Sequence, residues 1–205
     1  MERLYKKGVW LEYFTVVYNI VEAAVSIVFG TIANSIALVG FGLDSVVESL
    51  SGFVLIWRLR QHGKISPEEE ERIEQKAMKF VAVTFSILGL YVLFQSLKKL
   101  IGKEIPDPTL PGIIIAMVSI IVMPLLTWQK YKTGKKIRSR ALIADSKETL
   151  ACAFLSVALL LGLGSNYMFG FWQADPIVGL IIVVFLFREG WESWKESQEE
   201  IDRDA

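Results

Sequence analysis

The sequence predicts an all-α membrane protein with six transmembrane helices and with both termini in the cytoplasm. Hydrophobic residues make up 53% of the chain, and they gather in long apolar runs separated by short charged segments, as in multi-spanning membrane proteins. Six of these runs approach the roughly 20 residues that a helix needs to cross a bilayer. Basic residues concentrate in alternate segments between the runs, which sets the expected orientation.

The six expected spans cover residues 9–32, 35–57, 77–97, 110–128, 141–163 and 177–194. The first run contains Glu12 and Glu22 and is too long for a cleavable signal peptide, so we expect it to remain as a span. Ser66 is the expected N-cap, and Pro67 the first turn, of a helix leading into the third span. Pro176 marks the expected start of the sixth span.

Lysine and arginine predict the orientation. Of the 22 basic residues, 18 lie at the N-terminus, in the second and fourth linkers and at the C-terminal end, with Lys130 counted in the fourth linker. The other linkers contain only Lys98, Lys99 and Lys103. The positive-inside rule therefore places both termini in the cytoplasm.

One domain is expected. Residues 1–197 form the six-span transmembrane domain, residues 198–205 form a short cytoplasmic tail, and no C-terminal cytoplasmic domain follows. The cell membrane is the expected location. The 22 basic and 22 acidic residues balance, which gives no reason to expect a nucleic acid partner. The single cysteine, Cys152, excludes an internal disulfide framework.

Two spans carry acidic or thiol side chains that are costly in a bilayer. Asp44 and Glu48 share one face of the second span, and Glu148 and Cys152 share one face of the fifth. Counted from the charged ends of the spans, these positions lie at similar depth near the midplane. An ionised carboxylate there costs roughly 2.5–3.5 kcal/mol or more. Because protons or a bound cation would neutralise such groups, we expect a four-ligand cation site that exchanges metal for protons.

Three further polar residues accompany these four. Glu22 and Asp145 are open to three roles: direct ligand, support for the ligands, or proton carrier. For Asn19 we expect a hydrogen bond between helices. A purely structural role remains the alternative for the acids, although two carboxylates bind each other poorly. Buried cysteines often act as small hydrophobes, so a packing role for Cys152 is equally open.

The motif residues resemble the cation diffusion facilitator family. The stretch "NSIALVGFGLDSVVES" (residues 34–49) is similar to that family's second span, with Asp44 and Glu48 at its two metal-ligand positions. The stretch "RALIADSKETLACAF" (residues 140–154) resembles its fifth span, with Glu148 and Cys152 at the ligand positions. The resemblance implies six spans, both termini inside, and a homodimer. It is closest to short members that lack the C-terminal cytoplasmic domain.

The expected function is export of a divalent cation in exchange for protons by alternating access, without a resident cofactor. Carboxylate and thiolate donors suit Zn²⁺ best, and Co²⁺, Cd²⁺, Ni²⁺, Fe²⁺ and Mn²⁺ stay open. A zinc-binding membrane protein or partner subunit that does not transport is the main alternative. A channel would show flux without proton dependence. An enzyme is not expected, because the single histidine, His62, lies in a linker away from the acids.

Overall fold

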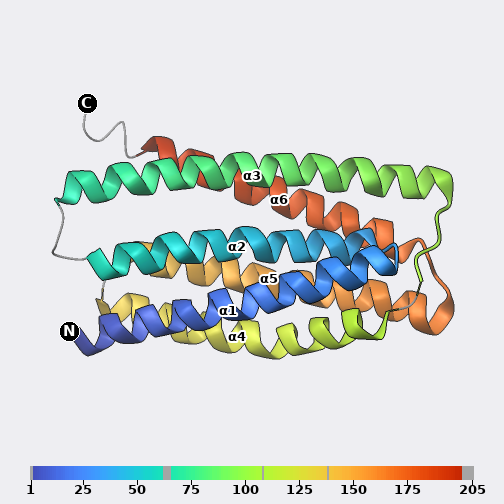
Figure 1. The fold of residues 1–205 in the computed structure, drawn as a ribbon, viewed down its shortest axis with the longest axis horizontal. Helices are drawn as coiled ribbons and strands as arrows, with labels where there is room; N and C mark the ends of the chain where they lie inside the picture. The colour runs from blue at the N-terminus through green and yellow to red at the C-terminus, as the bar shows by residue number, and fades with distance from the viewer. Residues whose placement is uncertain (1, 62–65, 108, 138, 200–205) are drawn as a thin grey trace.

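The computed structural model describes residues 2–61, 66–107, 109–137 and 139–199. These residues contain six α-helices and no strand, which confirms the all-α prediction for the described part of the chain. The helices are Glu2–Ile32 (α1), Ile36–Gln61 (α2), Pro67–Gly102 (α3), Leu110–Ile137 (α4), Arg140–Phe169 (α5) and Ala174–Glu199 (α6). Figure 1 shows them running side by side along the long axis of the molecule. His62 and residues 200–205 of the expected tail lie outside the described residues.

The helices extend beyond the apolar runs that predicted them. α3 begins at Pro67 rather than at residue 77, and α4 continues to Ile137 rather than ending at residue 128. Lysine, glutamate and arginine are good helix formers, so the charged flanks continue the helices outward. The predicted start of α3 is confirmed, because Ser66 Oγ accepts a hydrogen bond from the Glu69 N–H at 3.3 Å.

By length and apolar character, α1 to α5 can each cross a membrane. α6 falls outside this group because it carries Asp175 in its first turn and Arg188, Glu189 and Glu192 near its other end. Its apolar middle packs closely against α3, as Figure 1 shows. We therefore treat α6 as the sixth membrane segment.

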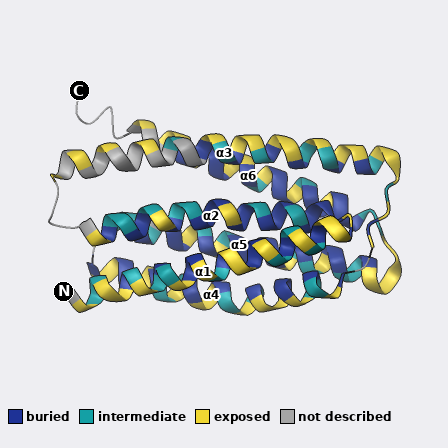
Figure 2. Cartoon of the chain, in the orientation of Figure 1, coloured by how far each residue is buried: buried dark blue, intermediate teal, exposed yellow. Residues whose placement is uncertain are grey.

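The bundle buries polar side chains and exposes apolar ones. Figure 2 shows the exposed positions in yellow and the buried positions in dark blue. One stripe of α1 is completely buried and polar: Glu12, Thr15, Asn19, Glu22 and Ser26. The outer face of the same helix is more than half exposed and apolar: Trp10, Phe14, Val17, Val21 and Val28. A soluble helix has the reverse distribution. This polarity fits a body surrounded by lipid, with its chemistry enclosed between the helices.

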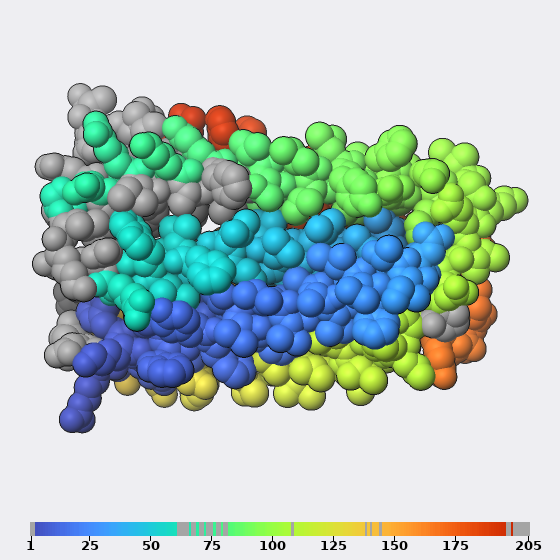
Figure 3. All heavy atoms as spheres, viewed as in Figure 1, coloured from blue at the N-terminus to red at the C-terminus, as the bar shows by residue number. Residues whose placement is uncertain are grey.

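Three helix pairs have the most extensive contacts: α1 with α2, α3 with α6, and α4 with α5. Glycines stand where the helices come closest. A side chain at Gly30 would meet the Val39 backbone nitrogen at 2.8 Å, and one at Gly134 would meet Ile143 Cγ1 at 2.9 Å. Small residues permit such close approach between membrane helices. Figure 3 shows the resulting face, in which α1, α2 and α3 lie side by side.

The first turn of α6 also fixes the start of α2. Asp175 Oδ2 accepts a hydrogen bond from the Ile36 N–H at 2.9 Å, and Ser35 Oγ donates to Asp175 Oδ1. A carboxylate at this place satisfies a backbone donor that the first turn of a helix leaves unpaired. The contact joins two segments that lie 139 residues apart in the sequence.

Candidate metal site

The central feature of the bundle is a contact between Cys152 on α5 and two carboxylates on α2. Cys152 Sγ lies 3.0 Å from Asp44 Oδ2 and 2.9 Å from Glu48 Oε2. The exposed fractions of the three residues are only 2%, 2% and 4% in the order Cys152, Asp44 and Glu48. The structure therefore brings together three of the four predicted ligands in the interior of the bundle.

Helical spacing turns these side chains toward one another. Asp44 and Glu48 lie one turn apart on the side of α2 that faces α5. The facing side of α5 carries a buried polar series at positions 145, 149, 152 and 156: Asp145, Thr149, Cys152 and Ser156. Residues at such intervals share one face of a helix. The two polar faces meet between α2 and α5.

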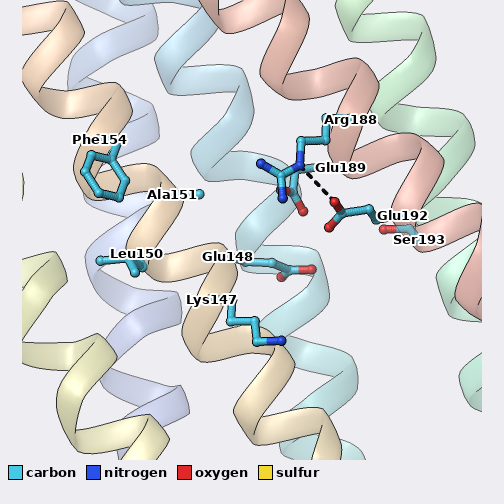
Figure 4. Close-up of a pocket in the computed structure, with 9 residues that line it drawn as sticks. All are labelled: Lys147, Glu148, Leu150, Ala151, Phe154, Arg188, Glu189, Glu192 and Ser193. Atoms are coloured by element: carbon cyan, nitrogen blue, oxygen red, sulfur yellow. Dashed lines mark hydrogen bonds and ion pairs between the residues drawn. The ribbon is translucent and has the colours of Figure 1, made fainter.

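Glu148, the fourth predicted ligand, lies beside this cluster. Its Oε2 accepts a hydrogen bond from Ser51 Oγ at 3.4 Å. Figure 4 shows its side chain directed toward α6, into a cavity of about 470 Å³ between α5 and α6. The charged residues that line this cavity are Lys147, Glu148, Arg188, Glu189 and Glu192. Arg188 Nε donates to Glu192 Oε1 at 2.8 Å, and the lining as a whole contains three acidic and two basic side chains.

Asp145 takes part in a buried ion cluster with Lys130 and Glu12. Lys130 Nζ lies 2.5 Å from Asp145 Oδ2 and 3.2 Å from Glu12 Oε2. It also donates to Thr149 Oγ1 at 3.2 Å, and Thr149 donates to Glu48 Oε1 at 3.1 Å. The ion cluster is thus connected to Glu48 on α2 through one hydroxyl group. Removing one partner of such a buried ion pair costs about 3–5 kcal/mol.

The position of Lys130 corrects the sequence interpretation. We counted this residue in the fourth cytoplasmic linker, but its side chain is completely buried inside the bundle. The reason is that α4 continues to Ile137 and turns Lys130 toward acids on α1 and α5. The excess of basic residues in the remaining segments still favours the predicted orientation.

Glu22 and Asn19 occupy the buried stripe of α1. Glu22 Oε2 accepts a hydrogen bond from Ser45 Oγ at 2.8 Å, and Glu22 Oε1 accepts one from Ser119 Oγ. Glu22 thus links α1 to α2 at Ser45, the residue after Asp44, and to α4 at Ser119. The hydrogen bond between helices that we expect for Asn19 is not found: among the described residues, neither its amide nitrogen nor its amide oxygen has a partner. The hydroxyl nearest to it along this stripe, on Thr15, bonds back to the Leu11 carbonyl instead.

Sequence reasoning did not assign Glu12, Thr149, Lys130 or Glu189 to the site. Glu189 is 7% exposed and lines the same cavity as Glu148. Thr149 could have been found from its spacing of four from Asp145 and three from Cys152. Glu12 lies seven residues before Asn19, on the same stripe of α1. Nothing in the sequence marked Lys130 as buried, because it follows the fourth apolar run and lies among other basic residues.

By type, a thiolate and two carboxylates are ligands of Zn²⁺ and of related ions. Among the described residues, however, no three Asp, Glu, Cys or His side chains are placed so that they could hold a metal ion as the structure stands. A thiol must lose its proton before it binds a metal, so binding at Cys152 would release a proton.

Comparison with known proteins identifies the family. Residues 13–201 match the cation efflux transmembrane domain. The chain belongs to the cation efflux family. This membership confirms the resemblance that the motifs around Asp44 and Cys152 suggested.

Several relatives of this family are similar to the chain. The manganese efflux system protein MneS of Bacillus subtilis is 22% identical over 197 residues, which are 94% of this chain and 67% of MneS. Transmembrane protein 163 of Xenopus laevis is 23% identical over 186 residues, 90% of this chain and 65% of the relative. An uncharacterised transporter of Methanocaldococcus jannaschii is 25% identical over 185 residues, 87% of this chain and 64% of that protein. The chain thus spans about two thirds of the length of these relatives.

Proposed function

We propose that the chain exports a divalent transition-metal ion, with Zn²⁺ as the best fit, from the cytoplasm in exchange for protons by alternating access. The observation that carries this proposal is the buried contact of Cys152 Sγ with Asp44 Oδ2 and Glu48 Oε2, at 3.0 and 2.9 Å. Membership in a family of cation transporters supports it. The same membership argues against the enzyme alternative.

The thiol favours zinc over harder ions. Sulfur ligands select Zn²⁺ and other soft ions, whereas Mn²⁺ and Mg²⁺ prefer oxygen and water. Manganese is the second candidate, because MneS is named for manganese efflux and shares this family. Co²⁺, Cd²⁺, Ni²⁺ and Fe²⁺ bind the same donor types, so we expect them to compete with zinc.

The cavity between α5 and α6 is the proposed route to the site. Its acidic lining attracts cations, and Glu148 lies one helical turn from Cys152 on α5. We assign to Glu148 the role of fourth ligand, which it takes when its side chain turns from the cavity toward Cys152.

Charge balance motivates the exchange with protons. Fully ionised, the four proposed ligands Asp44, Glu48, Glu148 and Cys152 carry four negative charges, two more than a divalent ion balances. When no ion is bound, these buried side chains must be neutralised by protons, because ionised groups are costly inside a membrane bundle. Protons and the metal ion would therefore alternate at these atoms. We also propose that the chain is a homodimer in the cell membrane, with both termini in the cytoplasm.

Zinc uptake into proteoliposomes tests this function. We expect Zn²⁺ flux that increases with a proton gradient of opposite direction and falls at least about tenfold in the double variant Asp44→Asn/Glu48→Gln. Glu104→Gln is the matched control, because Glu104 pairs with Lys98 at the surface, away from α2 and α5. Zinc binding without flux would indicate a binding protein, and flux that ignores the proton gradient would indicate a channel.

A further inference from the structure

The ammonium group of Lys130 is surrounded by oxygen atoms from two neighbouring helices. Glu12 Oε2 on α1 lies 3.2 Å from Nζ, Asp145 Oδ2 on α5 lies 2.5 Å away, and Thr149 Oγ1 on α5 lies 3.2 Å away. Lys130 and Glu12 are completely buried, and Asp145 is 4% exposed. A single positive charge is thus held by three oxygen donors within the membrane bundle.

These groups offer more oxygen than one ammonium uses. Glu12 Oε1 and Asp145 Oδ1 are both buried and have no hydrogen-bond partner within the described part of the chain. Two carboxylates also carry twice the charge of the ammonium they surround. A set of carboxylate and hydroxyl oxygens is the environment that hard cations such as Mg²⁺, Ca²⁺ and Mn²⁺ prefer.

We propose that Glu12, Asp145 and Thr149 form a second cation-binding site, and that the chain fills this site with its own Lys130 ammonium. The tethered cation keeps free metal ions out of this position. It differs from the site at Cys152 in its donors, which are all oxygen, and in its helices, which include α1 and α4.

Thr149 connects the two sites. Its hydroxyl accepts from Lys130 and lies 3.1 Å from Glu48 Oε1, so the filled second site helps to orient one carboxylate of the first. This connection rests on the proposed function of the first site. The second site itself does not depend on the proposed function, because it is inferred from the contacts of Lys130 alone.

Counting bound manganese tests the inference. The first site is disabled by Asp44→Asn/Glu48→Gln/Cys152→Ser, and the chain in nanodiscs is dialysed against Mn²⁺ alone. With Lys130 present we expect no bound Mn²⁺, and with Lys130→Ala added we expect one ion per chain. Lys130→Arg, which retains a tethered cation, should bind none. Lys130→Met combined with Glu12→Gln and Asp145→Asn, which removes the donors, should also bind none.

Folding is part of the measurement. If Lys130→Ala folds only when Mn²⁺ is present, as seen by thermal unfolding with and without the ion, the added cation has replaced the missing ammonium and the proposal holds. If Lys130→Ala binds no Mn²⁺, whether folded or not, the proposal is wrong. If Lys130→Ala binds one Mn²⁺ in the chain whose first site is disabled, the second site is supported even if the unmodified chain transports no ion. The two proposals can therefore fail separately.

Discussion

In the proposed site, Cys152 is the residue that we expect to limit the choice of ion most. Its sulfur contacts both carboxylates of α2, whereas the other donors near it are oxygen atoms. A soft sulfur ligand strengthens binding of zinc and cadmium and contributes little to binding of manganese or magnesium.

Replacing Cys152 by serine should therefore change the preference of the site. We expect Cys152→Ser to weaken zinc binding about tenfold or more and to leave manganese binding nearly unchanged, because a hydroxyl is a harder and less acidic donor than a thiol. Competition titrations of the two ions against a fluorescent chelator would measure the ratio. An unchanged ratio would mean that the sulfur does not touch the ion.

The sequence could predict part of this site and not the rest. Asp44, Glu48 and Cys152 stood out because ionisable side chains are rare and costly within apolar runs. Lys130 did not stand out, since its burial depends on how far α4 continues and on which way the helix is turned. Thr149 is a common type of residue in membrane helices, and only its contacts with Lys130 and Glu48 mark it.

Glycine spacing determines how closely the helices pack. Gly30 on α1 faces the backbone of α2 at Val39, whereas Gly164 on α5 has no atom within 4 Å of the position that a side chain would take. The apolar runs predicted where the helices would lie, but they carried no information on these close approaches. Contacts between helices depend on rotation about each axis, which composition alone does not determine.

These two glycines form a matched pair for mutation. Gly30→Ala should lower the free energy of unfolding by about 1–3 kcal/mol, because the added methyl group meets backbone atoms that cannot move aside. Gly164→Ala should leave stability unchanged or raise it by up to about 1 kcal/mol, since alanine is the better helix former. Thermal unfolding in detergent would compare them. Equal effects would mean that α1 and α2 are not held as closely as described.

For the molecule as a whole, the distribution of polarity was the most predictable property. Alternation of apolar runs and charged linkers predicted the all-α fold, and the described helices enclose polar groups and expose apolar ones. The orientation in the membrane stays a prediction from the basic residues. The arrangement of the bundle around Cys152 required the structure, because the four donors come from two spans separated by about a hundred residues.

X-ray absorption at the zinc K-edge is the most direct test of a zinc ion bound at Cys152, with the zinc-loaded chain held in nanodiscs. We expect one sulfur ligand at about 2.3 Å beside oxygen ligands at about 2.0–2.2 Å. The sulfur contribution should disappear in Cys152→Ser. A shell of oxygen and nitrogen atoms alone in the unmodified chain would contradict the claim that the ion binds between α2 and α5 at Cys152.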